Sequence, residues 1–450
     1  MSTINQNISF KDKDFLENIE YLLMIEDVYK GSRKIQNNPK YLKQGETESD
    51  DKYNERLKFS HFVNYLKPAI NLTANILFKK GTSVDYSSKY ERIFKNIDGE
   101  GNSIQKFSHQ VAKNALKDGY TAVWVDFPKV DSENNLSLFD VELNNIRPYL
   151  KNIKRKDILS KKISTVNGMS VLSQVVFKQT IEIPKDEFST EEEDVYIVLR
   201  ENQGFIFSET AESKKSRDKY EFNLLNSWEN SLGYIPFFPC YSNKEGFFKA
   251  DLPFYDLAHL NLTLYNLESD HQNIIHLTNV PTLQIFTGES ESPLKSQKKG
   301  KEENITVGVN KAFKFKDKST QGIEWVSPSG NCIKDGKENI DSVKKQLESM
   351  SLSIFSKESY NTATEANIAN SKNNLFLVEL ANSLETVIEM SVISMEDFSQ
   401  ENYNFTMTLS KDFDFATLDA TTIEKLSNMQ EKGQISLDTL WDGLVDQAGN

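Results

Sequence analysis

Apolar residues recur at steps of three and four over several long stretches, and this period is typical of amphipathic helices. Residues 11–30 and 103–118 follow it, and both stretches are predicted as helices. A longer helical pattern over 50–81 is interrupted at Pro68 and closed by Gly81. Proline removes a backbone donor and disfavours helical geometry before it, so we expect a kinked or broken helix there.

Alternation of apolar and polar residues predicts strands after these helices. The stretch "YTAVWVDFP" at 120–128 alternates and ends at Pro128, and further alternating segments follow at 170–184 and 194–207. The acidic run Glu191–Asp194 separates those two segments, and we expect it to be a solvated loop. Helices followed by a sheet predict the α+β class.

The stretch "DLPFYDLAHLNLTLYNLESDHQNIIHLTNVP" at 251–281 predicts an unusually long helix. Asp251 is a suitable cap, Pro253 suits the first turn and Pro281 ends the pattern, which gives about 27 residues and about 40 Å. Its apolar residues step by three and four in a seam that also contains His271, and such a seam requires a partner helix. The seam consists of Leu257, Leu260, Leu264, Leu267 and Ile274.

A second seam at 338–354 predicts that partner, through Ile340, Val343, Leu347, Met350 and Ile354. The roughly 55 residues between the two helices hold strand-like pieces and form a separate module in this interpretation. The stretch from Lys295 to Lys318 contains eight lysines and three acidic residues, so the module is locally basic. A third long helix is predicted from Glu365 to about Phe398, followed by a strand and two short C-terminal helices.

Composition narrows the class of protein. Hydrophobic residues make up 38% and charged residues 26%, as in ordinary folded proteins, while the net charge of -13 argues against a protein that grips nucleic acid over its whole surface. The two cysteines, Cys240 and Cys332, are interpreted as reduced core residues. Neither a signal peptide nor an apolar run of about 18 residues is visible, so synthesis in the cytosol is expected.

Candidate chemistry is sparse. His259, His271 and His276 do not have the i, i+4 spacing of a helical zinc site, so His271 is interpreted as a structural residue of the seam. Phosphate-binding, dinucleotide-binding and hydrolase motifs are absent from the sequence. Asp98 and Glu100, like the run Glu191–Asp194, are predicted to be solvated carboxylates rather than a metal site. No enzyme, cofactor or metal is therefore predicted.

The basic module leaves three alternatives open. Phe313, Phe315 and Trp325 lie near its lysines, and this combination is typical of phosphate contact and base stacking. An ordinary solvated hairpin with core aromatics fits equally well. A docking surface for an acidic protein is the third alternative.

The order of long helix, β-containing tip, returning helix, polar loop and another long helix resembles the portal proteins of tailed bacteriophages. Local sequence resembles a siphovirus-type subgroup of that family over roughly residues 40–400. The stretches that carry the resemblance are "YLKQGETESDDKYNERLKFSHFVNYLKPAINLTANILFKKG", "GYTAVWVDFP", "RPYLKNIKRKDIL", "IPFFPCY", "DLAHLNLTLYN" and "TATEANIANSKNNLFLVELANSLE".

The resemblance implies a portal-protein fold with a mainly helical wing plus β-sheet, a two-helix stem, a small clip, a kinked long helix and a short helical crown. Its implied divisions are an N-terminal helical arm 1–40, wing 41–250, first stem helix 251–281, clip 282–336, second stem helix 337–355, tunnel loop 356–364, long kinked helix 365–400, wing strand 401–418 and crown 419–450.

The resemblance also implies a function without enzymatic activity. Portal subunits form a ring of about twelve at one capsid vertex of the virion, through which double-stranded DNA is packaged and ejected. Expected partners are further copies of the chain, double-stranded DNA, a terminase, a head-tail adaptor and a capsid or scaffold protein, with no membrane. An acidic channel lets DNA slide, because many lysine or arginine contacts would hold it.

The residues implied for these roles fall into three groups. The tunnel loop would place Lys357, Ser359, Tyr360 and Asn361 near DNA. The clip would offer Lys295, Lys298, Lys299, Lys301, Lys311 and Lys314 to a partner or to DNA. Stem and subunit packing would use Leu257, Leu260, Leu264, Leu267, Val343, Leu347 and Met350.

Two other functions remain open from the sequence. The first is a capsid-associated interaction scaffold that binds partners through the lysine-rich tip without a closed DNA channel. The second is a metal-dependent nuclease, which would require Asp98 and Glu100 to converge with further carboxylates.

Overall fold

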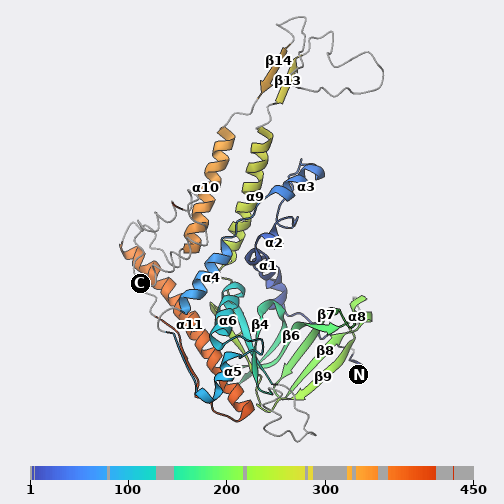
Figure 1. Ribbon diagram of the computed structural model, residues 1–450, viewed down its shortest axis with the longest axis vertical. Coiled ribbons are helices and arrows are strands. Elements are labelled where there is room, and N and C mark those ends of the chain that lie inside the picture. Colours follow the sequence, from blue (N-terminus) through green and yellow to red (C-terminus); the bar gives the residue numbers. More distant parts are fainter. Residues whose placement is uncertain are drawn as a thin grey trace. The chain divides into compact units, whose positions relative to one another are not determined.

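The structure is a computed structural model, and Figure 1 shows its ribbon. It describes residues 3–4, 6–78, 82–127, 146–215, 220–278, 282–286, 322–326, 331–352, 363–411 and 429. The chain divides into two compact units, one of residues 1–35, 63–262 and 346–450 and the other of 36–62 and 263–345. Helices and antiparallel sheets are both present, which confirms the mixed α+β class.

The N-terminal helices are α1 (Lys13–Lys30), α2 (Ser32–Ile35), α3 (Asp50–Phe59) and α4 (Leu66–Leu77). Asp12 caps α1 by accepting a hydrogen bond from the backbone N–H of Phe15 at 2.8 Å. The predicted break between α3 and α4 is confirmed, but it falls at 60–65 and not at Pro68. Pro68 lies in the first turn of α4, where its missing N–H has no intrahelical partner to lose.

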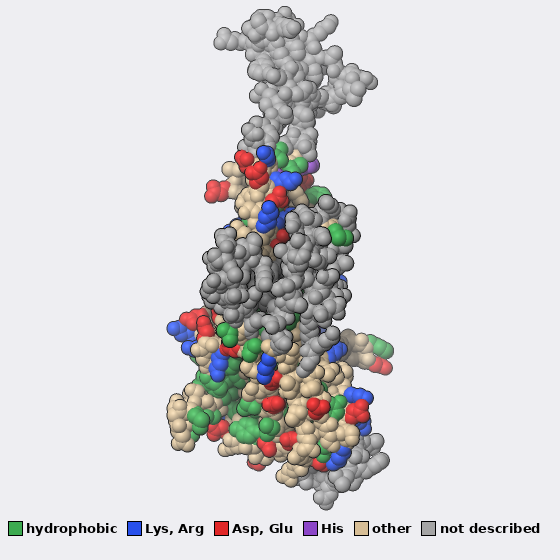
Figure 2. Space-filling model, turned by 90° about the vertical axis from the view of Figure 1, so that its left-hand side faces the viewer, with side chains coloured by type: hydrophobic (Ala, Val, Ile, Leu, Met, Phe, Trp, Pro, Cys, Tyr) green, Lys and Arg blue, Asp and Glu red, His purple; other side chains and the backbone are tan. Residues whose placement is uncertain are grey.

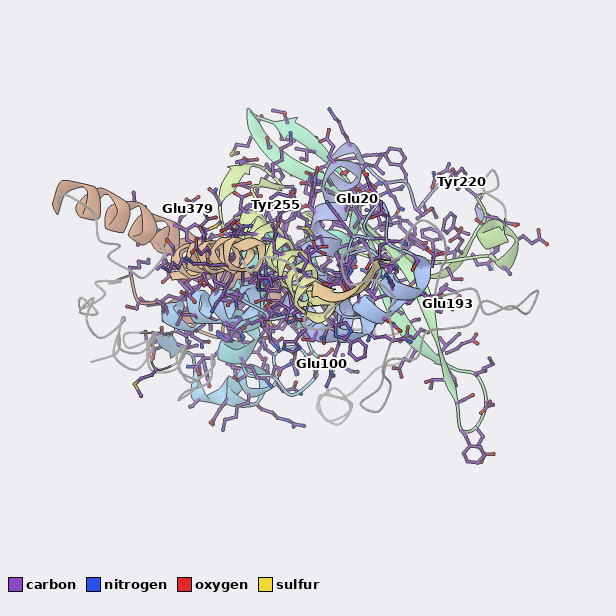
Figure 3. The ribbon with its side chains drawn as sticks, turned by 90° about the horizontal axis from the view of Figure 1, so that it is seen from above. Glu20, Glu100, Glu193, Tyr220, Tyr255 and Glu379 are labelled. Carbon is purple, nitrogen blue, oxygen red and sulfur yellow. The ribbon has the colours of Figure 1, made fainter. Side chains whose placement is uncertain are left out.

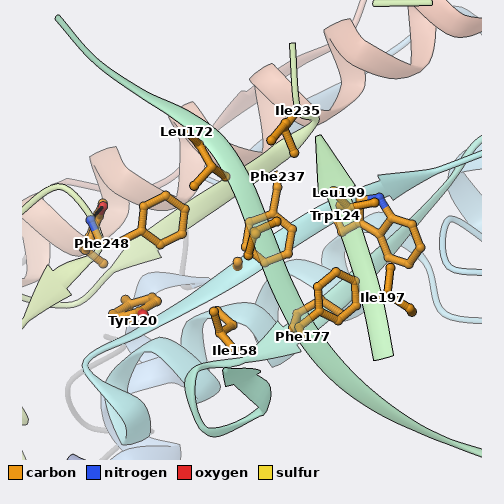
Figure 4. Close-up of a cluster of buried hydrophobic side chains, with 14 of the residues drawn as sticks. Tyr120, Trp124, Ile158, Leu172, Phe177, Ile197, Leu199, Ile235, Phe237 and Phe248 are labelled. Carbon is orange, nitrogen blue, oxygen red and sulfur yellow. Dashed lines mark hydrogen bonds between the residues drawn. The ribbon is translucent and has the colours of Figure 1, made fainter. Parts of the chain in front are cut away.

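A three-stranded antiparallel sheet lies at the centre of the first unit, with strand order β10-β3-β4. Its strands are β3 (Tyr120–Asp126), β4 (Tyr149–Lys154) and β10 (Phe237–Tyr241), and the helix α6 (Ile104–Asp118) packs on β3. The apolar side chains of Figure 4 form its core, with Trp124 and Phe237 on either side of Phe177. The helix predicted at 103–118 is thus confirmed as α6, and the strand predicted at 120–128 is confirmed over Tyr120–Asp126.

A six-stranded antiparallel sheet has the order β1-β9-β8-β7-β6-β5. Its strands are β1 (Thr3–Ile4), β5 (Ile158–Val166), β6 (Met169–Pro184), β7 (Thr190–Arg200), β8 (Gln203–Glu209) and β9 (Phe222–Glu229). The expectation of a loop at Glu191–Asp194 was wrong, because these residues form the start of β7 and pair with β6.

Short elements connect the larger ones. They are β2 (Ser83–Asp85), η1 (Ser88–Tyr90), α5 (Glu91–Lys95), η2 (Arg155–Asp157), α8 (Ala211–Lys215), β11 (Lys244–Gly246) and β12 (Lys249–Ala250). The predicted strand after residue 401 is confirmed only as β15 (Thr406–Thr408), which pairs with β2. Apart from residue 429, the predicted C-terminal helices lie outside the described residues.

The remaining elements are α9 (Tyr255–Thr278), β13 (Thr282–Phe286), β14 (Gly322–Val326), α10 (Asn331–Leu352) and α11 (Ala363–Ser399). The expected cap of α9 was wrong, because Asp251 accepts a hydrogen bond from the N–H of Leu252 and the helix begins later, at Tyr255. Helix α10 begins at Asn331, earlier than the expected residue 337.

Helix α11 packs on β10 and β3, and most of its side chains between 375 and 399 are buried or half-buried. Its buried side chains include Leu377, Ala381, Leu384 and Ile388, which step by three and four along one face. On the face of the molecule in Figure 2, acidic and basic side chains are interspersed among apolar ones over the described residues.

Candidate functional site

The candidate site is the block formed by α9, the β13–β14 ribbon and α10. Strands β13 and β14 pair antiparallel from Thr282↔Val326 to Phe286↔Gly322, so the chain turns back between the two helices. Within the second unit, Lys344 on α10 forms an ion pair with Glu268 on α9, with Nζ and Oε1 2.8 Å apart. Figure 1 shows α9 and α10 side by side in opposite directions.

A close approach between the two helices depends on Gly336. A Cβ atom at this position would lie 3.0 Å from Nδ1 of His271, which is tighter than ordinary van der Waals contact. His271 therefore lies in the seam opposite α10, as its position in the heptad pattern predicted. Together with the Lys344–Glu268 ion pair, this contact fixes which turns of the helices are opposite each other.

The predicted packing residues differ in burial. Leu257 and Leu264 on α9 are buried, whereas Leu260 and Leu267 are only half-buried. On α10, Val343 and Leu347 are buried, while the side chain of Met350 is 37% exposed. Ile274, the last apolar position of the α9 seam, is 43% exposed.

Polar side chains of α9 also have partners, and these come from the segment 41–65. In the first unit, Asn261 donates from Nδ2 to the carbonyl of Val63 and accepts at Oδ1 from the N–H of Tyr65, at 2.8 and 2.9 Å. In the second unit, Asn266 makes the same pair of bonds to the carbonyl of Tyr41 and the N–H of Lys43. These amides hold the backbone of the segment along α9.

Arg56 on α3 is the strongest of these attachments. Its guanidinium donates to both carboxylate oxygens of Glu48 at 2.8 Å, and to Ser269 and Asp270 of α9 at 3.1 and 3.0 Å. The carbonyl of Lys43 accepts a further bond. Only a planar fork of five donors can serve so many acceptors at once.

The charges around Arg56 perturb one another. The hydrogen bonds that Arg56 donates to Glu48 lower the pKa of Glu48 and raise the pKa of Arg56. Burial raises the pKa of Asp270, an effect that the charge of Arg56 opposes. Sequence reasoning missed Arg56, because a single arginine on a polar helix gives no periodic signal, although it lies within one of the stretches that carry the family resemblance.

The residues considered for metal chemistry have other partners. Asp98 accepts hydrogen bonds from the N–H of Glu100 at 2.9 Å and from Nδ2 of Asn102 at 2.6 Å, so it closes a turn. The ring of His259 lies beside that of Tyr255 on the same helix. Within the part of the chain that the structure describes, no three histidine, cysteine or acidic residues come together as a metal site.

Two groups of predicted site residues lie outside the described residues. They are the clip lysines Lys295, Lys298, Lys299, Lys301, Lys311 and Lys314, and the tunnel-loop residues Lys357, Ser359, Tyr360 and Asn361. Among the described helices, none is long and apolar enough to cross a membrane.

Comparison with known proteins gives three results. A family described as a domain of unknown function (DUF4055) matches residues 253–399, which span α9 to the end of α11. No curated protein matches the chain. Two solved structures are similar over 83% of this chain, and both concern gene transfer agent particles.

The first of these structures is a virion of a native gene transfer agent particle, with a TM-score of 0.38, 9% identity and 86% of its chain covered. The second is the neck of an empty particle computed with C6 symmetry, with a TM-score of 0.36, 8% identity and 85% of its chain covered. TM-scores of this size do not by themselves establish a common fold.

Proposed function

We propose that this chain is a portal protein, a non-enzymatic subunit of a ring-shaped channel at one capsid vertex for packaging and ejection of double-stranded DNA. The observation that carries the proposal is the order of α9, the β13–β14 ribbon, α10 and α11, with the first two helices antiparallel and in contact. This order corresponds to stem, clip, stem and long helix in the family that the sequence resembles.

The exposed line of α11 supports an oligomeric subunit. Residues 375, 379, 382, 386, 390, 393 and 397 are its exposed positions between 375 and 399, and they step by three and four along one edge of the helix. Three of them are large and apolar, with Leu375 67%, Ile393 52% and Met390 43% exposed. Apolar side chains aligned in this way favour burial against another molecule.

The proposed roles of the other residues follow from the resemblance. Lys357, Ser359, Tyr360 and Asn361 would face DNA in the channel, and the clip lysines would face a terminase, an adaptor or DNA. A net charge of -13 favours passage of DNA over retention, because each additional cationic contact to phosphate would strengthen binding.

Negative-stain electron microscopy of the purified chain tests the proposal, with mass photometry of the same sample. We expect closed rings with a central hole of about 20 Å or more, wide enough for duplex DNA. Open arcs or monomers at every concentration and salt, with or without capsid protein as a template, would contradict the channel and favour the scaffold alternative.

A pair of variants tests the α11 line within this experiment. Leu375→Glu places a charge on the line, and we expect it to raise the concentration needed for ring formation by about tenfold or more. Met169→Glu is the matched control, because Met169 on β6 is also 67% exposed. The control should assemble like the unchanged chain, and equal behaviour of the two variants would exclude α11 from the interface.

A further inference from the structure

Within the part of the chain that the structure describes, the outer half of the β6–β7 hairpin has no neighbouring strand on either side. Strand β5 pairs with β6 only up to Phe177, and β8 pairs with β7 only from Val195. Among the described strands, residues 180–184 and 190–194 therefore pair only with each other. We call residues 180–194 the acidic arm, and Figure 3, which labels Glu193, shows this ribbon projecting from the sheet. Isolated two-stranded ribbons are marginally stable in water, so such an arm gains from a partner surface.

The acidic arm carries a strong negative charge. Its carboxylates are Glu182, Asp186, Glu187, Glu191, Glu192, Glu193 and Asp194, against one lysine, Lys185. Glu182 and Glu192 are directly opposite each other in the pairing register. Like charges in opposite positions destabilise an antiparallel pair, and a cationic partner would relieve this repulsion.

The tip of the arm presents a preorganised aromatic side chain. Phe188 is 92% exposed, although the turn that holds it is tightly bonded. Asp186 accepts from the N–H groups of Phe188 and Ser189 at 2.9 and 2.8 Å and from the hydroxyl of Ser189 at 2.5 Å. The turn thus holds the ring of Phe188 in a defined, solvent-exposed position. Because the turn is already ordered, little conformational entropy is lost when the ring binds a partner.

A cationic cavity lies elsewhere on the first unit. Its volume is about 440 Å³, and it is lined by Glu91, Arg92, Lys95, Asn96 and Arg147. Three basic side chains outnumber Glu91, which forms an ion pair with Lys95 at 2.7 Å, so the lining keeps a net positive charge. Arg147 donates to the carbonyls of Pro148 and Asn96, so its guanidinium has a fixed orientation. Burial lowers the pKa of Arg147, and the nearby charge of Arg92 acts in the same direction.

We propose that the acidic arm of one copy docks into the cationic cavity of a neighbouring copy, with Phe188 against the guanidinium of Arg92 and the carboxylates around Arg92 and Lys95. The chemistry of the two surfaces is complementary in charge, and arginine also stacks on aromatic faces. The arm of one copy and the side chains of Arg92 and Lys95 of its neighbour are exposed, so they can meet without unfolding of either copy.

The two surfaces are different patches of the same chain, so the contact is heterologous. A heterologous contact repeated by a rotation generates a closed ring. The inference rests on the proposed ring and deepens it, because it names one of the contacts that close it. The arm would then serve as a brace between adjacent subunits.

Charge exchange between the two surfaces tests the contact, with ring formation measured by mass photometry over a range of protein concentrations. Glu192→Lys with Glu193→Lys, or Arg92→Glu with Lys95→Glu, should each raise the concentration for half-assembly by about tenfold. Combining all four substitutions should return the concentration for half-assembly to within about threefold of that of the unchanged chain. Phe188→Ala should weaken assembly without changing its salt dependence.

Controls with the same change of charge separate this contact from net charge. Glu17→Lys with Glu20→Lys lies on the exposed surface of α1, and Lys13→Glu with Lys106→Glu reverses two exposed lysines. Both controls should assemble like the unchanged chain. The proposal would be overturned if the controls lost as much assembly as the arm and cavity variants. It would also be overturned if the combined variant did not recover.

Cross-linking distinguishes failure of this contact from failure of the ring. A photoreactive phenylalanine at position 188 of the full chain is irradiated in a mixture of ¹⁴N- and ¹⁵N-labelled copies. Cross-links between copies to residues 91–96 or 147 support the contact, whether or not rings are seen. Rings with cross-links mapping elsewhere would leave the portal proposal intact and overturn the docking of the arm.

Discussion

At the scale of single residues, two buried carboxylates of the first unit respond to burial in opposite ways. Burial raises the pKa of Glu26, but hydrogen bonds from Lys156 and Lys30, at 2.5 and 3.0 Å, outweigh it and lower the pKa to about 2. Among the described residues, the carboxylate of Asp118 forms an ion pair with Lys117 at 3.7 Å, and its Oδ2 has no hydrogen-bond partner. Burial therefore raises the pKa of Asp118 to about 6.

These directions predict a pH dependence of opposite sign for the two groups. Glu26 stabilises the fold above its unfolded pKa, and this contribution is lost as pH falls toward 2. Asp118 has a folded pKa above the unfolded one, so the fold is most stable with Asp118 protonated and loses that stability as pH rises through about 6.

The substitution Asp118→Asn removes the titration of Asp118 but keeps the shape of the side chain. We expect the free energy of unfolding of this variant, relative to the unchanged chain, to improve by about 2 kcal/mol between pH 4 and pH 8. Urea unfolding at pH 4, 6 and 8 measures the difference. A difference that stays constant over this range would show that Asp118 remains ionised in the folded chain throughout.

At the scale of elements, the contact between α9 and α10 can be tested at Gly336. Alanine at an interior helix position stabilises a helix by about 1 kcal/mol relative to glycine. At Gly336 the new methyl group would meet His271 at 3.0 Å, so we expect Gly336→Ala to bring little gain. In a chain that also carries His271→Ala, the same substitution should recover about 1 kcal/mol, measured by hydrogen exchange of α10. If Gly336→Ala stabilised the chain by the full amount of about 1 kcal/mol with His271 present, the two helices would have to lie further apart than in the structure.

Helix and strand positions were predictable wherever periodicity was strong and the ends had clear signals. Helix α6 begins after Ser103, whose hydroxyl accepts a hydrogen bond from the N–H of Lys106, and it ends at Asp118, before Gly119, which has a positive φ of 80°. The start of α10 was missed because Gly336, an ordinary terminator, lies inside the helix. Its small size is required there by the neighbouring helix, and tertiary contacts of this kind leave no trace in local periodicity.

The acidic run at 191–194 was missed for a similar reason. Glutamate is depleted in strands, so the run indicated a loop. In the structure it pairs with Ile181 and Ile183 of β6, and Lys178 and Lys185 form ion pairs with Asp194 and Glu191. Backbone pairing across a long hairpin thus overrides local propensity, and the arm that results could not have been recognised from the sequence.

At the scale of the whole molecule, charge determines how a channel would treat DNA. The chain carries a net charge of -13, and a ring multiplies that charge around its axis. Nonspecific binding of duplex DNA comes mainly from cations that replace counterions on phosphates. An acidic ring should therefore hold DNA weakly even though residues 295–318, which we propose form part of a clip, include eight lysines.

We expect the assembled chain to bind a 30-base-pair duplex with a Kd above about 10 µM at 150 mM NaCl, measured by fluorescence anisotropy. Lys298→Glu with Lys299→Glu should reduce the slope of log K against log salt by about one per lost phosphate contact if the clip touches DNA. An unchanged slope would instead assign these lysines to a protein partner. Binding tighter than about 1 µM in the unchanged chain would contradict a channel through which DNA slides, because retained phosphate contacts would have to break at every step of translocation.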